Sequence, residues 1–294
     1  MDTSETIHEQ VPQGSAYLLD NAGREAPARF NALASLFDSG TIRHFENCGV
    51  DSGWQCLEIG GGGGSIANWL AARVGSTGRV IATDIDPRFL KALAHPPVEV
   101  WQHNIVLDPL PEAAFDLVHA RLVLIHVPQR EEVLRRMISA LKPGGWLLSE
   151  EFDSASLIPD PGVNPGETLL KTHIAMFRLM ESRGVERRFG RLLLHRLHTY
   201  RLVNAGAEGR IFMWQAHTPG ASLMRANYEQ LRDAMIQAGY ITDQQFSQDL
   251  ATMQEPALHD AVSNSLVCMG PPTVGKGMVL RTQSTLGTGA TQQE

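Results

Sequence analysis

Five consecutive glycines, Gly60 to Gly64, constrain the fold of this chain more than any other stretch. They follow a short apolar segment, 55–59, and precede apolar residues with helical spacing over 65–73. This order predicts a buried strand, a tight turn and a helix. Glycine suits the turn because a Cβ atom would oppose positive φ angles and the close approach of a ligand to the backbone. The stretch therefore predicts a ligand site at the end of the strand, facing the N–H groups that begin the helix.

Strands and helices continue to alternate after this turn. The patterns predict further strands over 79–84, 98–103, 115–119 and 146–149, and helices over 87–94 and 130–141. Lys142-Pro-Gly-Gly145 is expected to stop the last helix before its strand. Such alternation indicates an α/β fold, a doubly wound, Rossmann-like, mostly parallel sheet with helices on both faces. Ligands of such sheets bind at the carboxyl ends of the strands.

The flanking regions are predicted to add helices and two late strands. We expect two or three helices over 16–49, then helices over 167–181, 191–204, 222–238 and 243–253, with strands over 207–215 and 261–269. The sheet would then have seven strands. We expect four parts. They are an N-terminal helical segment covering the site (1–50), a core that binds the ligand (51–151), helical lid insertions with the last strands (152–270), and a disordered tail (271–294).

Composition excludes several classes of partner. The net charge of −7 gives no electrostatic footprint for nucleic acid. No apolar run is long enough to span a membrane, and the first residues are polar rather than signal-like, so we expect a cytoplasmic protein. The three cysteines lack the spacing of a metal site or a disulfide framework, and no metal is expected.

The glycine stretch alone leaves two ligand classes open. Gly62, Gly64 and Ala67 match the spacing of a dinucleotide site nominally, although five glycines make such a match easy by chance. Glu58, just before the turn, would repel the phosphates of a dinucleotide and favour a ligand with a cationic amino-acid part.

Four motifs together are more specific. They are LEIGGGGG at 57–64, ATDID at 82–86, FDLV at 115–118 and LKPGGWLL at 141–148. In this order and at these intervals the chain resembles the class I S-adenosylmethionine-dependent methyltransferases, strongly over 54–150 and loosely in the flanks.

The resemblance implies S-adenosylmethionine as cofactor and assigns nine residues to its site: Glu58, Gly60, Gly62, Gly64, Asp84, Ile85, Asn104, Ile105 and Arg121. The glycines and Glu58 correspond to the loop that takes the methionine part. Asp84 corresponds to the acid that accepts hydrogen bonds from both ribose hydroxyls, and Ile85 to the residue against adenine. Asn104 departs from the family's usual aspartate, but its carbonyl can still accept from the adenine amine. For Arg121 a surface salt bridge is as good an interpretation as a cofactor contact.

The methyl acceptor is less constrained. No Asn-Pro-Pro-Tyr type signature follows the fourth predicted strand, which disfavours nucleic-acid amino groups and glutamine amides. We expect a small organic acceptor, methylated at a hydroxyl, of the secondary-metabolite or quinone sort. No catalytic base is identified; Tyr17, His126, Glu151 and His173 are candidates for acceptor contact, each with a structural alternative.

Two other functions remain as alternatives. One is an NAD(P)-dependent oxidoreductase, and the other is a methyltransferase-fold protein that uses the cofactor for cyclisation or isomerisation without methyl transfer. The oligomeric state is left open, a homodimer included.

Overall fold

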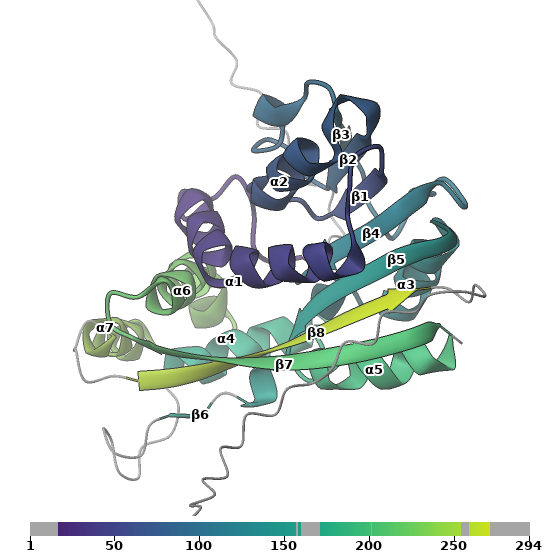
Figure 1. Ribbon diagram of the computed structural model, residues 1–294. Helices are drawn as coiled ribbons and strands as arrows, with labels where there is room; N and C mark the ends of the chain where they lie inside the picture. Colours follow the sequence, from purple (N-terminus) through teal and green to yellow (C-terminus); the bar gives the residue numbers. More distant parts are fainter. Residues whose placement is uncertain (1–16, 157, 160–170, 201, 254–258, 271–294) are drawn as a thin grey trace, which may run out of the picture.

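The sheet has a parallel half that matches the predicted alternation. The computed structural model describes residues 17–156, 158–159, 171–200, 202–253 and 259–270. Within these residues the strands form one sheet in the order β3-β2-β1-β4-β5-β8-β6, with β7 paired to β8 (Figure 1). The five parallel strands are β1 (Gln55–Ile59), β2 (Arg79–Asp84), β3 (Val98–Gln102), β4 (Phe115–Arg121) and β5 (Leu141–Phe152). The predicted parallel α/β core is confirmed.

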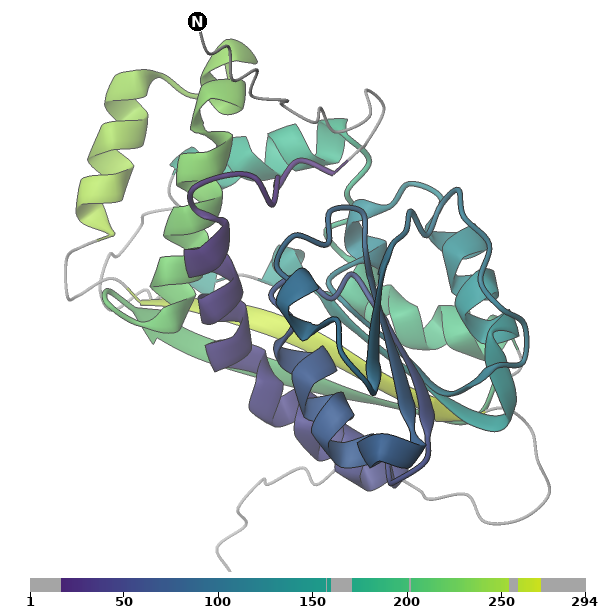
Figure 2. The ribbon, with the colours of Figure 1, turned by 90° about the horizontal axis from the view of Figure 1, so that it is seen from above.

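Helices cover both faces of these strands. Leu57 and Ile59 face a core that includes α3 (Arg130–Ser139) and α5 (Phe189–Thr199). Cys56 precedes Leu57 in the strand and packs on the other face. The second core includes α2 (Ser65–Val74) and the end of α1 (Ala26–Cys48). Figure 2 shows α2 and α3 on opposite sides of the strands. Strands that are apolar on both faces are typical of such a sheet.

The N-terminal region differs from the two or three helices predicted. Residues 17–25 form turns, and a single helix, α1, occupies the rest. It continues through Gly40, where a Cβ atom would lie 1.4 Å from Nη1 of Arg210 on the neighbouring strand β7. The glycine therefore makes room for a side chain from a distant strand instead of ending the helix. Gly49, with a left-handed φ of 77°, ends it.

Two local predictions around prolines were wrong. The segment 87–94 contains only turns and a short 3₁₀ helix, Lys91–Leu93, and Pro96 and Pro97 prevent any helix from continuing beyond it. Lys142-Pro-Gly-Gly145 lies inside β5 rather than before it. These residues form a bulge, since Phe115 pairs with Leu141 whereas Leu117 pairs with Trp146.

The antiparallel half of the sheet extends beyond the prediction. Its strands are β6 (Ile158–Pro159), β7 (Val203–Gln215) and β8 (His259–Gly270). The predicted total of seven strands is wrong, because the described residues contain eight; the additional one is the two-residue β6. The predicted disordered tail, 271–294, lies outside the described residues.

Three more helices accompany this half. They are α4 (Lys171–Ser182), α6 (Pro219–Gln237) and α7 (Asp243–Thr252). The chain leaves the sheet after β7, forms α6 and α7, and returns as β8, and both views place α6 beside α1 (Figures 1 and 2). Across the described ranges, no helix combines the length and the apolar character needed to cross a membrane.

Candidate functional site

The glycine turn joins β1 to α2 at the carboxyl edge of the sheet. Gly60, Gly62 and Gly64 have φ angles of 67°, 50° and 80°, in the region that side chains disfavour. A Cβ atom on Gly62 would lie 2.6 Å from the ring of Phe30 on α1. The N–H of Gly61 donates to the carbonyl of Thr83 at 2.9 Å, which ties the turn to β2. The turn thus needs glycine both for its backbone angles and for the close approach of α1.

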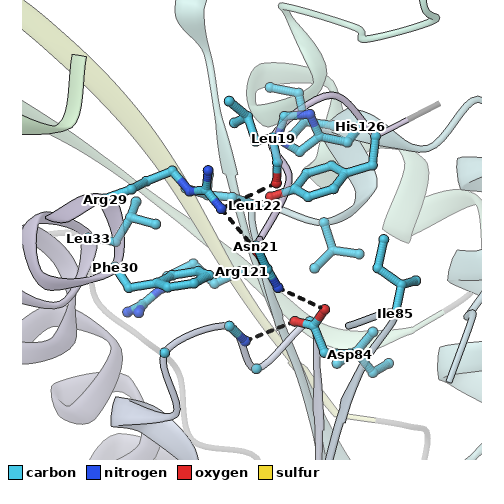
Figure 3. A pocket seen from close by; sticks show the side chains of 18 of the residues that line it. Leu19, Asn21, Arg29, Phe30, Leu33, Asp84, Ile85, Arg121, Leu122 and His126 are labelled. Carbon is cyan, nitrogen blue, oxygen red and sulfur yellow. Dashed lines mark hydrogen bonds between the residues drawn. The ribbon is translucent and has the colours of Figure 1, made fainter. Parts of the chain in front are cut away.

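Asp84 ends β2 beside this turn, and its carboxylate accepts three hydrogen bonds. The N–H of Gly62 donates to Oδ2 at 3.0 Å, and the N–H of Asp86 donates to Oδ1 at 3.0 Å. The side-chain amide of Asn21 donates to Oδ1 at 3.3 Å (Figure 3). Burial raises the pKa of Asp84, although these backbone donors oppose the shift. One position on Oδ2 is left for a further donor, since each carboxylate oxygen accepts about two hydrogen bonds.

Asn21 belongs to an N-terminal stretch that the sequence did not reveal as part of the site. Arg29 of α1, only 2% exposed, donates to Oδ1 of Asn21 at 3.0 Å and to the carbonyl of Leu19 at 3.3 Å. Its other nitrogen donates to Gln230 of α6. Figure 3 shows Asn21 between Arg29 and Asp84. The sequence held one signal for this contact. Arg29 stands four residues before Leu33, at a position where the apolar side of the helix would otherwise have an apolar residue.

Glu58 is buried beneath the turn and already has a partner. Its Oε2 lies 2.5 Å from Nδ1 of His119 on β4, the residue beside it in the sheet. Glu150 lies on the neighbouring strand β5, paired with Arg121, and accepts a hydrogen bond at 2.8 Å from the hydroxyl of Thr41. Burial raises the pKa of Glu150, and the neighbouring His119 acts against that shift. These groups form a polar layer between the strands and α1.

A cavity of about 1270 Å³ extends from the turn to helices α4 and α6. Eight of the nine residues expected at the cofactor site line it; the exception, Gly64, caps the start of α2. Toward α4 and α6 the wall is mostly apolar, formed by Phe37, Phe152, Met176, Phe177, Met180, Leu223 and Met224. The cavity therefore joins a polar end at Asp84 to an apolar end.

Three expected cofactor residues have contacts of their own within this wall. Asn104 uses Oδ1 to accept from the N–H of Val106 at 3.0 Å, so that its carbonyl is already engaged by its own turn. Arg121 donates to Asp38 at 2.9 Å, which is the salt bridge considered as its alternative, yet it also lines the cavity. Ile105 is 7% exposed and belongs to the core as well as the wall.

The candidates for acceptor contact fall into two groups. Tyr17, His126 and His173 line the cavity, and the rings of Tyr17 and His126 meet edge to face at 5.2 Å between centroids. Burial lowers the pKa of His126 to about 4, so it is neutral near pH 7. Glu151 is instead structural. Its carboxylate accepts from the N–H groups of residues 123–125, and so holds the loop after β4 in place.

Comparison with known proteins identifies this region. Residues 57–149 match the family model described as a methyltransferase domain. Methyltransferase str2 of Strobilurus tenacellus is 38% identical over 145 residues, which cover 47% of this chain and 50% of that protein. The ubiquinone/menaquinone biosynthesis C-methyltransferase UbiE of Salmonella arizonae is 29% identical over 175 residues, covering 54% and 70%. The chain spans about half the length of the str2 and str3 relatives it matches.

Solved structures agree on the fold. A crystal structure described as a putative methyltransferase from Bacillus halodurans has a TM-score of 0.52 at 17% identity, covering 80% of this chain and all of that one. Phosphoethanolamine N-methyltransferase 2 of Haemonchus contortus, solved with S-adenosylhomocysteine, has a TM-score of 0.54 at 14% identity, covering 87% and 59%. Residues 57–149 therefore match a methyltransferase domain in sequence, and the fold around them is that of the two solved structures.

Proposed function

We propose that this chain binds S-adenosylmethionine and transfers its methyl group to a hydroxyl of a small organic acceptor. The observation that carries the proposal is the continuous cavity, which joins the glycine turn and Asp84 to an apolar wall. A cofactor and an acceptor can meet in one such space, where the protein contributes mainly by holding the two reactants in line.

The residues at the polar end fit the cofactor. Gly60 and Gly62 line the cavity without side chains, which leaves room for the methionine part against the backbone. The free position on Oδ2 of Asp84 suits a ribose hydroxyl. Ile85 and Ile105 would flank adenine, and the remaining assigned residues would complete the site: Glu58, Gly60, Gly64, Asn104 and Arg121. When bound, S-adenosylmethionine supplies an electrophilic methyl group on a sulfonium sulfur.

The other parts of the chain would enclose this site. The segment 1–50, of which residues 17–50 are described, would cover the cofactor end, where Asn21 and Arg29 are hydrogen-bonded to each other and Asn21 to Asp84. The region 152–270 would act as the lid over the acceptor, because α4 and α6 supply much of the apolar wall. Exclusion of water by that wall would protect the reacting groups and strengthen their electrostatic interactions. The core between them, 51–151, would hold the cofactor.

Titration of the protein with S-adenosylhomocysteine and, separately, with NAD tests the cofactor. We expect binding of S-adenosylhomocysteine and none of NAD; binding of NAD alone would refute the proposal in favour of an oxidoreductase. Incubation with methyl-labelled cofactor and a metabolite extract then tests transfer, with the Asp84→Ala variant as the negative control. Label should enter a small organic molecule, and conversion of an extract component without labelling would favour a cyclase or isomerase.

A further inference from the structure

A histidine in the apolar part of the cavity wall has an unused nitrogen. His173 of α4 is 3% exposed and lines the cavity, and its Nδ1 lies 2.6 Å from the hydroxyl of Tyr228 on α6. Its Nε2 is buried and has no hydrogen-bond partner among the described residues. The ring is fixed edge to face against Phe177, at 4.6 Å between centroids. The imidazole is thus held rigidly with one nitrogen unsatisfied.

A second polar atom in the same wall is also unsatisfied. Asn227 precedes Tyr228 on α6 and lines the cavity, and its Oδ1 is buried without a partner in the described part of the chain. An unpaired buried polar atom destabilises the fold, and most such atoms in native proteins are paired. Both atoms belong to residues that line one cavity, so a bound molecule can supply the missing partners.

The two atoms have complementary requirements. A phenolic hydroxyl donates well to an imidazole nitrogen, so the contact with Tyr228 leaves the proton of His173 on Nε2, which is then a donor without a partner among the described residues. The carbonyl oxygen of Asn227 can only accept. A ketone would satisfy the histidine alone, and an ammonium group would satisfy the asparagine alone. Hydroxyl groups both accept and donate, and therefore match both atoms.

The surroundings define the rest of the ligand. Met176, Phe177 and Met180 follow His173 at helical spacing on α4 and line the cavity with it. An apolar body would fill this wall while its hydroxyl reaches the polar atoms. We propose that His173, positioned by Tyr228 and assisted by Asn227, anchors a hydroxyl of an apolar, phenol-like acceptor. The identification of this ligand as the methyl acceptor rests on the proposed function, but binding of its hydroxyl to His173 does not depend on methyl transfer.

A matched pair of probes tests the anchor. 4-Ethylphenol and 4-ethyltoluene differ only by a hydroxyl against a methyl group of nearly equal volume. Calorimetric titration of the full chain, with and without S-adenosylhomocysteine, should show about tenfold tighter binding of the phenol, as expected for one hydrogen bond of about 1.4 kcal/mol. His173→Leu should abolish that preference, and His173→Gln should retain part of it. His44→Leu, which removes an equally buried histidine away from the cavity, should leave the preference unchanged.

The outcomes separate the two proposals. Equal binding of the two probes, binding of neither, or an unchanged preference in His173→Leu would overturn the anchor even if S-adenosylhomocysteine binds normally. A phenol preference that depends on His173 in a protein that fails to bind S-adenosylhomocysteine would support the anchor and count against the proposed function. If His173→Leu does not fold, Tyr228→Phe replaces it, and it should reduce the preference because the proton is no longer held on Nε2.

Discussion

Replacement of Asp84 by asparagine tests the polar end of the cavity most directly. The wild-type carboxylate accepts from two backbone N–H groups and from Asn21. With two acceptor positions on each oxygen, one position on Oδ2 is free, and a second ribose hydroxyl needs the position that Asn21 now fills. Asparagine retains one carbonyl oxygen but turns an N–H₂ group toward a donor. Asp84→Asn should therefore lose about one charge-assisted hydrogen bond to the ribose.

The expected loss follows from the energy of such a bond. A hydrogen bond to a charged group contributes about 1.5–3 kcal/mol, which corresponds to roughly ten- to hundredfold weaker binding. Calorimetric titration with S-adenosylhomocysteine at neutral pH measures this change. Because burial raises the pKa of Asp84, wild-type affinity should also begin to fall on acidification at a higher pH than an ordinary aspartate would cause. The Asn variant should lack that part of the pH dependence.

Asp116→Asn is the matched control. Asp116 also accepts from a backbone N–H, that of Gln55 at 2.8 Å, and from Lys142 at 2.7 Å, but it lies at the opposite end of the strands. This variant should bind S-adenosylhomocysteine like the wild type. Affinity within twofold of the wild type for Asp84→Asn, or an equal loss for Asp116→Asn, would refute the assignment of the ribose to Asp84.

Three further changes test the turn, the N-terminal stretch and the loop after β4. Gly62→Ala should lose more unfolding free energy than Gly49→Ala in thermal denaturation, because both glycines have left-handed φ angles but only Gly62 has Phe30 within reach of a Cβ; equal losses would contradict this. Arg29→Met should expose residues 17–21 to faster chymotrypsin cleavage, and an unchanged rate would contradict its anchoring role. Burial raises the pKa of Glu151 to about 8, so the folded state retains a proton that the unfolded state releases near pH 4.5. Wild-type stability should therefore fall as pH rises between these values, and Glu151→Gln should show a flatter dependence in denaturant titrations; identical slopes would rule this out.

The parts of the site that are continuous in sequence were predictable. The strand 55–59, the glycine turn, the helix after it and the acid at the end of β2 follow local rules, since each is set by neighbouring residues. The parallel pairing then brings Asp84 beside the turn, as the order of the strands requires. For these elements, periodicity and glycine placement were sufficient.

The rest depends on contacts between distant residues. Arg29 meets Gln230, which lies 201 positions away, and nothing near either residue indicates the pairing. The bulge in β5 brings Gly145 against the backbone of Phe115, where a Cβ would lie 2.8 Å from the carbonyl oxygen. Read locally, the same Lys-Pro-Gly-Gly sequence predicts a turn outside the strand. His173 was equally compatible with solvent until α6 placed Tyr228 against it.

The long pairing of β7 with β8 has a mechanical consequence. β5 pairs with β8 only as far as Asn264, and beyond it the two-residue β6 is the other neighbour, whereas β7 continues along β8 for five more pairs, from Ile211 with Ser263 to Gln215 with His259. This ribbon leads into α6, and α6 forms part of the cavity wall. The twist of the ribbon therefore contributes to the position of α6 relative to the glycine turn. Substitutions along it, far from any reacting atom, should alter the size of acceptor that the cavity accommodates.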